Sequence, residues 1–379
     1  MIPNRRVYFL SGFDPRGASF YHRLYREEAR KQARLNGAKI STSKRQRASA
    51  LFHKWTVQAD WQGQSTKTDY QFLSWDDLIR KNWVDSLVIL IARSMLMYVW
   101  HIRTGLLRKF KKAGRGPFFS SIFPLVFIVL SSVVISLSAV AVACTLNWMI
   151  ANIFVSMIGV CAMLIWLIKR AKKMGDKLGV WWILQTYLFL ATWGKKPIAD
   201  MNDRIQQFAD QIIADAKESP VDEVLIVGHC VGSILAVAIL AKIIENNDVA
   251  LEGKLKLITL GQCIPYVSYP STATAFRQDL VTVVENEHYP WVDMGARADP
   301  LCFDQVDPAK AEGMSVSRRR WPITKAVRPY HMYSSETYEK LKKNKLRIHF
   351  QYLMSSELLT DYDYFRLTTG PEPLAVQAE

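Results

Sequence analysis

A cysteine lies between two glycines where the sequence predicts a strand that runs directly into a helix. The run Val221–Gly232 reads VDEVLIVGHCVG, and its β-branched residues predict a short buried strand. The helical run Ser233–Leu240 follows at once. This layout puts Cys230 on a sharp turn above a sheet, where only glycine leaves room at Gly228 and Gly232. The N-terminus of the following helix favours negative charge and so promotes a thiolate. We predict a nucleophilic cysteine; a small buried cysteine without chemistry is the alternative.

A carboxylate follows this turn in the order that a nucleophile elbow requires, which is nucleophile, then acid, then histidine. Asp299 begins the step Asp299-Pro300, just beyond the predicted strand Trp291–Met294. The loop after a strand end is where the acid should fall, so Asp299 is the preferred residue. Three other aspartates remain as alternatives: Asp293, Asp304 and Asp307.

The general base is predicted to be His331. It precedes the predicted helix Ser335–Lys343 and therefore lies on a loop, from which it can reach the elbow. His349 falls in an apparent strand, which favours a structural role, but it remains the alternative. His288 precedes the acid and breaks the expected order. His229, beside the nucleophile, is expected to pack or to form hydrogen bonds beneath the site.

These residues define a mechanism of acyl transfer. His331 would take the thiol proton, and Asp299 would hold the imidazole in the correct tautomer. Cys230 would then attack a carbonyl and form an acyl-enzyme. The backbone N–H groups of Val231 and Phe13 are predicted to form the oxyanion hole, in which one donor is worth about 3 kcal/mol.

The most apolar part of the chain predicts a membrane hairpin. The chain has 379 residues, is 50% hydrophobic and carries a net charge of +15, yet residues 118–168 contain no charged side chain. At roughly 20 residues per span, this length holds two transmembrane helices. We predict them near residues 122–143 and 149–168, joined by a turn at residues 145–147. A buried core hairpin is the alternative. Basic residues flank the segment on both sides: Arg108, Lys109, Lys111, Lys112, Arg115, Lys169, Arg170, Lys172, Lys173 and Lys177.

This distribution of charge predicts how the protein lies in the membrane. The positive-inside rule puts both basic flanks in the cytoplasm, and with them both termini and the catalytic domain. Anionic lipid headgroups beside the spans would supply the counter-charge, so the bilayer rather than nucleic acid is the expected partner.

Cysteine usage and the N-terminus suggest a protein of a reducing compartment. The five cysteines are scattered singly, without a CxxC pair or a His/Cys cluster. The sequence therefore predicts neither a disulfide framework nor a metal site, and no cofactor is expected. The N-terminus becomes polar after a few apolar residues, so it lacks the core of a signal peptide.

The hairpin is predicted to interrupt an α/β domain that has a mostly parallel sheet with helices on both faces. The expected boundaries are 1–82 for the first part of this domain, 83–194 for the membrane insertion and 195–379 for the second part, which carries the elbow. Two apolar segments inside the insertion, 84–100 and 180–193, are predicted to lie in the membrane interface, and the second is also a candidate cover over the site. For both, a buried core helix is the alternative. The expected strands span residues 6–13, 52–60, 70–75, 255–260, 280–285 and 291–294, and the main helices 21–35, 198–217 and 233–246.

Over residues 1–82 and 195–379 the chain resembles the α/β-hydrolase superfamily. The run Gly228-His229-Cys230-Val231-Gly232 is also similar to the cysteine-containing lipase box of polyhydroxyalkanoate synthases. Those enzymes use a Cys-Asp-His triad to move acyl groups from a coenzyme A thioester. The chain departs from the hydrolase pattern at Ser11-Gly12-Phe13, where many members have His-Gly, and this weakens the oxyanion assignment.

The resemblance implies an esterase, thioesterase or acyltransferase that acts on a lipid-like ester or thioester, with acyl-coenzyme A among the candidate donors. A catalytically inactive hydrolase fold, retained as a membrane scaffold, is the alternative. A transporter is disfavoured, since two spans without an intramembrane charge leave no evident solute path.

Overall fold

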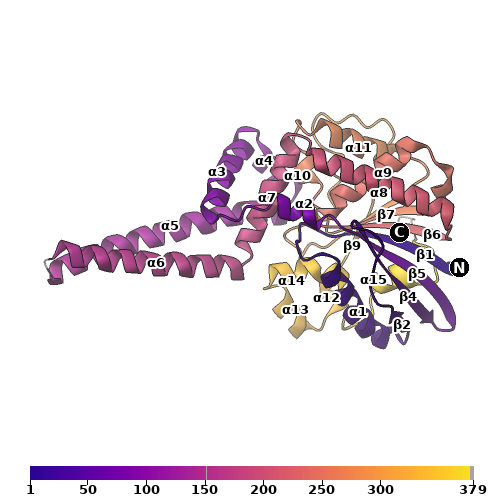
Figure 1. The fold of residues 1–379 in the computed structure, drawn as a ribbon, viewed down its shortest axis with the longest axis horizontal. Coiled ribbons are helices and arrows are strands. Elements are labelled where there is room, and N and C mark those ends of the chain that lie inside the picture. Colours follow the sequence, from indigo (N-terminus) through magenta and orange to yellow (C-terminus); the bar gives the residue numbers. More distant parts are fainter. Residues whose placement is uncertain (151, 376–379) are drawn as a thin grey trace.

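A nine-stranded sheet organises the α/β part of the chain in the order β2-β4-β5-β1-β6-β7-β8-β9, with the short β3 paired to β4. The structure is a computed structural model that describes residues 1–150 and 152–375 (Figure 1). The neighbouring strands β5, β1, β6, β7, β8 and β9 are all parallel to one another. Strand β4 pairs antiparallel with β2, β3 and β5. The predicted α/β class with a mostly parallel sheet is therefore confirmed. The strands are β1 (Asn4–Leu10), β2 (Lys39–Thr42), β3 (Gln46–Arg47), β4 (Phe52–Trp61), β5 (Gln64–Leu73), β6 (Glu223–His229), β7 (Leu255–Leu260), β8 (Trp291–Gly295) and β9 (Ile323–Ala326).

Helices cover both faces of this sheet, which explains why its central strand β6 is buried along its whole length. Alternate residues of β6 enter two separate cores. Val224 and Ile226 face the core that contains α8, α9 and α11, whereas Leu225 and Val227 face the core of α1, α14 and α15. The helices of the two layers are α1 (Gly17–Asn36), α2 (Asp76–Lys81), α8 (Ala199–Glu218), α9 (Gly232–Asn246), α10 (Pro265–Ser268), α11 (Thr274–Glu285), α12 (Pro329–Met332), α13 (Ser335–Leu341), α14 (Lys345–Phe350) and α15 (Tyr364–Thr369), with 3₁₀ turns η1 (Val249–Leu251) and η2 (Gln351–Leu353).

Two predicted strands are helical in the structure. Residues 280–285 were expected to be a β segment because Val281, Val283 and Val284 are β-branched, but they form the end of α11. Val283 and Val284 are fully buried there, so tertiary packing outweighs their strand preference. His349, expected in a strand, lies in the short helix α14.

The insertion leaves the α/β layers after α2 and returns with α8. Figure 1 shows its long pair α5 and α6 projecting from the domain as a hairpin, with α3, α4 and α7 at its root. Helices α5 and α6 are both long and apolar enough to cross a membrane. Their most apolar 18-residue windows have mean hydropathies of 2.7 and 1.9 and are only 6% buried. A buried core hairpin is thereby excluded. These helices are α3 (Leu87–Arg103), α4 (Leu106–Ala113), α5 (Arg115–Ile150), α6 (Ile153–Lys177) and α7 (Val180–Lys195).

The bend of the hairpin lies later than predicted. The expected turn at residues 145–147 falls inside α5, which continues to Ile150. Helix α6 begins after Asn152, whose side chain caps it by accepting hydrogen bonds from the Phe154 and Val155 N–H groups. Residues 145–147 lack glycine and proline, so nothing in them interrupts the helix, whereas Asn152 is a strong N-cap.

Candidate functional site

Cys230 occupies the strained position between β6 and α9 that the sequence predicts. Its φ is 57°, in the left-handed region, although it is not glycine. A Cβ atom at Gly228 would lie 2.6 Å from the Gly232 carbonyl oxygen, and one at Gly232 would lie 2.7 Å from the Ser11 carbonyl oxygen. Both glycines are therefore required by backbone contacts, and the turn presents Cys230 at the N-terminus of α9.

The loop after β1 lies against Cys230. A Cβ atom on Gly12 would approach the Cys230 Cβ to 3.0 Å and its Sγ to 3.4 Å. Asp14, which is buried, fixes this loop, because its carboxylate accepts hydrogen bonds from the Arg16 backbone N–H at 3.0 Å and from the Tyr21 hydroxyl at 2.9 Å. Strands β1 and β6 are neighbours in the sheet, so their carboxyl ends bring Gly12 and Cys230 together.

Asp299 and His349 form a buried hydrogen-bonded pair. The His349 Nδ1 lies 2.7 Å from the Asp299 Oδ2, and neither side chain is exposed. The other carboxylate oxygen accepts a hydrogen bond from the Leu301 N–H at 2.9 Å, and the Tyr352 hydroxyl donates to Oδ2 at 3.1 Å. Gly261, at the end of β7, leaves the space for this group, since a Cβ there would overlap the Tyr352 ring at 2.6 Å. The carboxylate thus holds the imidazole by one nitrogen and leaves Nε2 free.

The structure does not bring His331 to this site. His331 lies in α12, is exposed and lines a groove beside β9, together with Lys325 and Arg328. Its place beside Asp299 is taken by His349, the alternative that the sequence left open. The reason is local: α14 and η2 turn residues 345–353 inward under the elbow, whereas α12 stays on the surface.

The alternative aspartates have other partners or face elsewhere. Asp293 points from β8 to the Thr259 hydroxyl at 2.5 Å, and Asp307 forms an ion pair with Arg319. Asp304 packs against Gly295. Asp299 is the aspartate that contacts a histidine near Cys230, but this histidine is His349 and not the predicted His331. His288 is exposed near Glu252.

The electrostatics of Cys230 and His349 favour an ion pair. The pKa of the Cys230 thiol is lowered well below its usual value, because the adjacent Cys263 thiol and the positive charge of His349 stabilise the thiolate and together outweigh burial. Burial alone would lower the pKa of His349, but the charges of Asp299 and Cys230 raise it well above its usual value. The His349 Nε2 has no hydrogen bond of normal geometry to any described residue.

The sequence did not single out Cys263, which follows β7 directly and lines the same small cavity as Cys230. Burial and the negative charge of Cys230 raise its pKa well above the usual value, so it stays protonated and can donate. The sequence did contain a signal for this contact, since Cys263 lies two residues after Gly261, just beyond the end of a predicted strand. The carboxyl ends of neighbouring parallel strands meet at one edge of a sheet, so residues that follow two such strands can lie close together.

We expect Cys263→Ala to raise the pKa of Cys230, because the mutation removes the donor that stabilises the thiolate. The rate of alkylation of Cys230 by iodoacetamide, followed by mass spectrometry across pH, should then rise at higher pH than in the wild type. Cys263→Ser retains a donor and is the matched control, with a profile close to that of the wild type. Identical profiles for Cys263→Ala and the wild type would contradict this role of Cys263.

His229 supports the site from beneath, as expected. Its Nε2–H donates to the His349 carbonyl oxygen at 2.9 Å, and the two rings lie 4.9 Å apart. Burial and the nearby His349 lower the pKa of His229 to about 4, so it stays neutral. It therefore fixes the backbone of the imidazole that faces Cys230.

Two backbone N–H groups are available as oxyanion donors. The N–H groups of Val231 and Phe13 donate no hydrogen bond to any residue that the structure describes. Both lie in the turns that meet at Cys230. The Phe13 carbonyl accepts a hydrogen bond from the Trp182 indole N–H at 2.9 Å, and the Phe13 ring packs on Phe189 at 4.7 Å, so helix α7 holds this turn in place.

Helix α7 covers Cys230. Its residues close a small, mostly apolar cavity that Cys230 and Cys263 also line. The cavity volume is about 10 Å³, which is near the minimum for one water molecule. The structure therefore leaves no open cavity beside Cys230. The α7 residues in the lining are Trp182, Ile183, Thr186, Tyr187 and Leu190.

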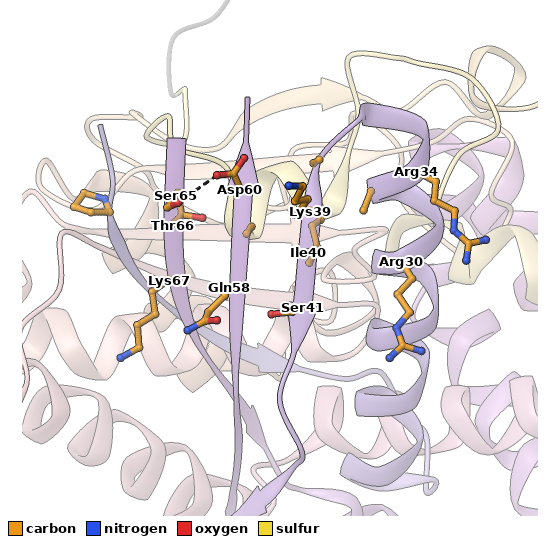
Figure 2. Close-up of a pocket in the computed structure, with 14 residues that line it drawn as sticks. Arg30, Arg34, Lys39, Ile40, Ser41, Gln58, Asp60, Ser65, Thr66 and Lys67 are labelled. Atoms are coloured by element: carbon orange, nitrogen blue, oxygen red, sulfur yellow. Dashed lines mark hydrogen bonds between the residues drawn. The ribbon is translucent and has the colours of Figure 1, made fainter. Parts of the chain in front are cut away.

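The pocket of Figure 2, between α1 and strands β2, β4 and β5, does not belong to this site. It has a volume of about 750 Å³ and contains neither cysteine nor histidine among its lining residues. Basic side chains from α1, β2 and β5 surround it, and the Ser65 hydroxyl donates to Asp60 at 3.3 Å.

The described residues contain no cluster of three or more His, Cys, Asp or Glu side chains that could hold a metal ion. In comparisons with known proteins, no family model, no curated protein and no solved structure matches this chain.

Proposed function

We propose that this protein is a membrane-anchored acyl-transfer enzyme that forms an acyl-thioester on Cys230. The observation that carries the proposal is the hydrogen bond of 2.7 Å between Asp299 and His349, which orients a buried imidazole beside a cysteine on a strained turn. A buried carboxylate, a histidine and a cysteine in this order are the parts of a nucleophilic triad. In this proposal His349, not His331, is the base.

The first half of the reaction is acylation. The Cys230 thiol proton passes to His349 Nε2, and the Sγ attacks the carbonyl carbon of an ester or thioester. The resulting oxyanion accepts hydrogen bonds from the Val231 and Phe13 N–H groups. When the tetrahedral intermediate collapses, the bond to the alcohol or thiol breaks, and this leaving group takes the proton from His349. Asp299 keeps the imidazolium oriented and stabilises its charge.

The second half of the reaction is deacylation, which regenerates the free Cys230 thiol. Water or an acceptor alcohol gives its proton to His349 and attacks the acyl-Cys230 carbonyl. The Sγ leaves as thiolate and regains the proton from His349. Hydrolysis and transfer differ only in the attacking group, so thioesterase, esterase and acyltransferase share these residues.

An α/β-hydrolase fold is part of the proposal. The support is positional: the nucleophile follows β6, the acid follows β8 and the histidine follows β9, in the chain order of that superfamily. The strand next to the elbow strand, β1, ends in the turn that contains Phe13, which is where a second oxyanion donor is expected. The absence of His-Gly at Ser11-Gly12 is a departure from the common pattern.

The membrane placement supports an apolar substrate. Helices α5 and α6 would form a two-span hairpin, and their basic flanks favour a cytoplasmic domain and contact with anionic headgroups. Two residues separate the end of α6 from the start of the candidate cover α7, so an acyl chain from the bilayer would reach Cys230 along α7. Lipid-like esters and acyl thioesters are the substrates that fit this arrangement.

A second candidate function is a membrane scaffold with an inactive hydrolase fold. The observation that favours it is the closed site, since Cys230 is only 5% exposed and the cavity beside it has no room for a substrate. A scaffold's cysteine would be an inert buried thiol, whereas a nucleophile would react at neutral pH.

The test is intact-mass spectrometry of the detergent-purified protein after brief exposure to an acyl thioester and to an activated ester. We expect the wild type to gain the mass of one acyl group, and Cys230→Ala to gain none. Cys263→Ala, which keeps the nucleophile, controls for acylation of a neighbouring thiol and should still be acylated. If no donor gives an adduct and Cys230 is no more reactive than Cys302, the scaffold function is favoured.

A further inference from the structure

Helix α3 presents an apolar face that no part of the described chain covers. Its inner side chains Leu90, Met97 and Tyr98 are buried, and the Tyr98 hydroxyl ties α3 to α5 through the Ser121 carbonyl at 2.8 Å. The opposite face is exposed, with Val88 at 76%, Leu96 at 70% and Ile102 at 63% of their full surface. The spacing places the exposed apolar residues in one stripe along the helix. The stripe consists of Val88, Ile89, Ala92, Leu96, Val99 and Ile102, and two exposed arginines accompany it, Arg93 at its edge and Arg103 at the C-terminal end of the helix.

We propose that α3 lies in the membrane interface with this stripe immersed in the upper acyl-chain region of the lipids. Figure 1 shows α3 at the root of the hairpin, running across the direction in which α5 and α6 project. A helix in that position lies along the surface of a bilayer that the hairpin enters. In this proposal lipid covers both the stripe and the exposed apolar side chains of α5 and α6.

The charges of α6 indicate that the edge of the hydrocarbon core lies at the level of α3. The uncharged part of α6 runs from Ile153 to Ile168 and is about 24 Å long, somewhat less than the hydrocarbon core of about 30 Å. The exposed cations that follow, from Lys169 to Lys177, would snorkel to the headgroups. The root of α5 is in contact with protein instead, because Phe127 is buried and packs on Trp181 of α7 at 5.8 Å. The headgroup region thus falls at the junction between hairpin and domain, where α3 lies.

Helix α4 supplies matching positive charge. It meets α3 at a bend of 76°, buries Leu106 and Phe110, and exposes three cations. A bilayer-spanning course for α3 and α4 together would put these cations into hydrocarbon, whereas an interfacial α3 leaves them among anionic headgroups. The cations are Arg108, Lys111 and Lys112.

With α3 in the membrane interface, the bilayer would lie close to the proposed site. The membrane contact of α3 does not require that site to be active. Gln185 of α7 holds the segment before α3, since its side chain accepts from the Val84 N–H at 3.1 Å and donates to the Val84 carbonyl at 2.7 Å. An immersed α3 therefore sits directly beside the helix that covers Cys230. The membrane contact holds whether or not Cys230 is a nucleophile.

The test uses a fluorophore on α3 in the full-length protein. In a Cys144→Ser, Cys161→Ser background, which removes the two exposed cysteines, Leu96→Cys is labelled with NBD and reconstituted into phosphatidylcholine–phosphatidylserine vesicles. Leu359→Cys is the matched control, because Leu359 is 69% exposed, nearly as much as Leu96, but lies beside the C-terminal segment. Intact mass confirms a single label, and circular dichroism confirms the fold.

We expect a blue-shifted emission at position 96 and at least a twofold stronger quenching by 5-doxyl lipid than at position 359. Quenching at 96 as weak as at 359 would overturn the proposal and indicate a face that is free or covered by protein. Stronger quenching by 12-doxyl than by 5-doxyl lipid would also overturn it, because α3 would then lie deep in the bilayer as part of a broken span. Acylation of Cys230, measured on the same samples, reports separately on the proposed activity.

Discussion

His349→Ala should lower the rate of acylation of Cys230 by about 10²–10⁴-fold, the usual contribution of a general base. The physical reason is that His349 both accepts the thiol proton and supplies the charge that lowers the pKa of Cys230. Without it, the thiol titrates at higher pH, so the remaining reactivity should increase as pH rises above neutrality. Pre-steady-state release of the leaving group from an activated ester, followed from below pH 6 to above pH 9, measures both effects.

His331→Ala is the matched control for this experiment. His331 is exposed and stands in a groove beside β9, so its removal should leave the acylation rate within about twofold of the wild type. Asp299→Asn should keep the fold of the site but favour the wrong imidazole tautomer, and we expect a loss in the same range as for His349→Ala. A large loss in His331→Ala with little change in His349→Ala would reverse the assignment of the base.

Gly228→Ala should destabilise the protein by at least about 3 kcal/mol, which places it among the most damaging single substitutions. The new Cβ would lie 2.6 Å from the Gly232 carbonyl oxygen and 2.7 Å from the Ser233 Cα, and both are backbone atoms that cannot turn away. Because β6 is buried along its whole length, the strand cannot shift without disturbing both cores. For a domain of this size such a loss lowers the Tm by roughly 6–12 °C, measurable by thermal denaturation in detergent.

Gly253→Ala is the control that distinguishes the overlap of the new Cβ with backbone atoms at position 228 from a general effect of replacing glycine. Gly253 has a φ of 70° and open space around its Cα, so alanine there costs only the left-handed backbone, about 1–2 kcal/mol. We therefore expect a smaller fall in Tm than for Gly228→Ala. Equal falls would mean that the contacts of Gly228 are not the cause of its effect.

Local patterns in the sequence were sufficient to predict the strand–turn–helix unit at Cys230 and the two apolar helices of the hairpin. The run before Gly228 is β-branched and the run after Gly232 is helical, and each signal is confined to neighbouring residues. The uncharged block ending at Ile168 likewise predicts helices that avoid water, and α5 and α6 are confirmed as long, exposed apolar helices. Such local patterns predict these elements correctly because they depend on the conformational propensity and hydrophobicity of neighbouring residues. They do not depend on which distant segment packs against them.

The start of α14 also had a local signal, which our interpretation missed. Asn344 precedes a run that includes His349, and its side chain accepts a hydrogen bond from the Arg347 N–H at 3.0 Å, as an N-cap does. Reading that asparagine as a helix start would have removed the reason to treat His349 as part of a strand. It would not have shown that His349 faces Asp299.

Only the tertiary structure decided which histidine meets the acid. His331 and His349 both follow Asp299 in the chain, so chain order could not choose between them. The choice depends on the packing of α14 and η2 beneath the elbow, which brings the His349 and Tyr352 side chains to Asp299. The same holds for Cys263, which reaches Cys230 because β7 is the neighbour of β6. A sequence carries the local preferences of each segment, whereas these contacts join residues that lie from about 30 to about 50 positions apart. Only the packing of the sheet and its helices brings such residues together.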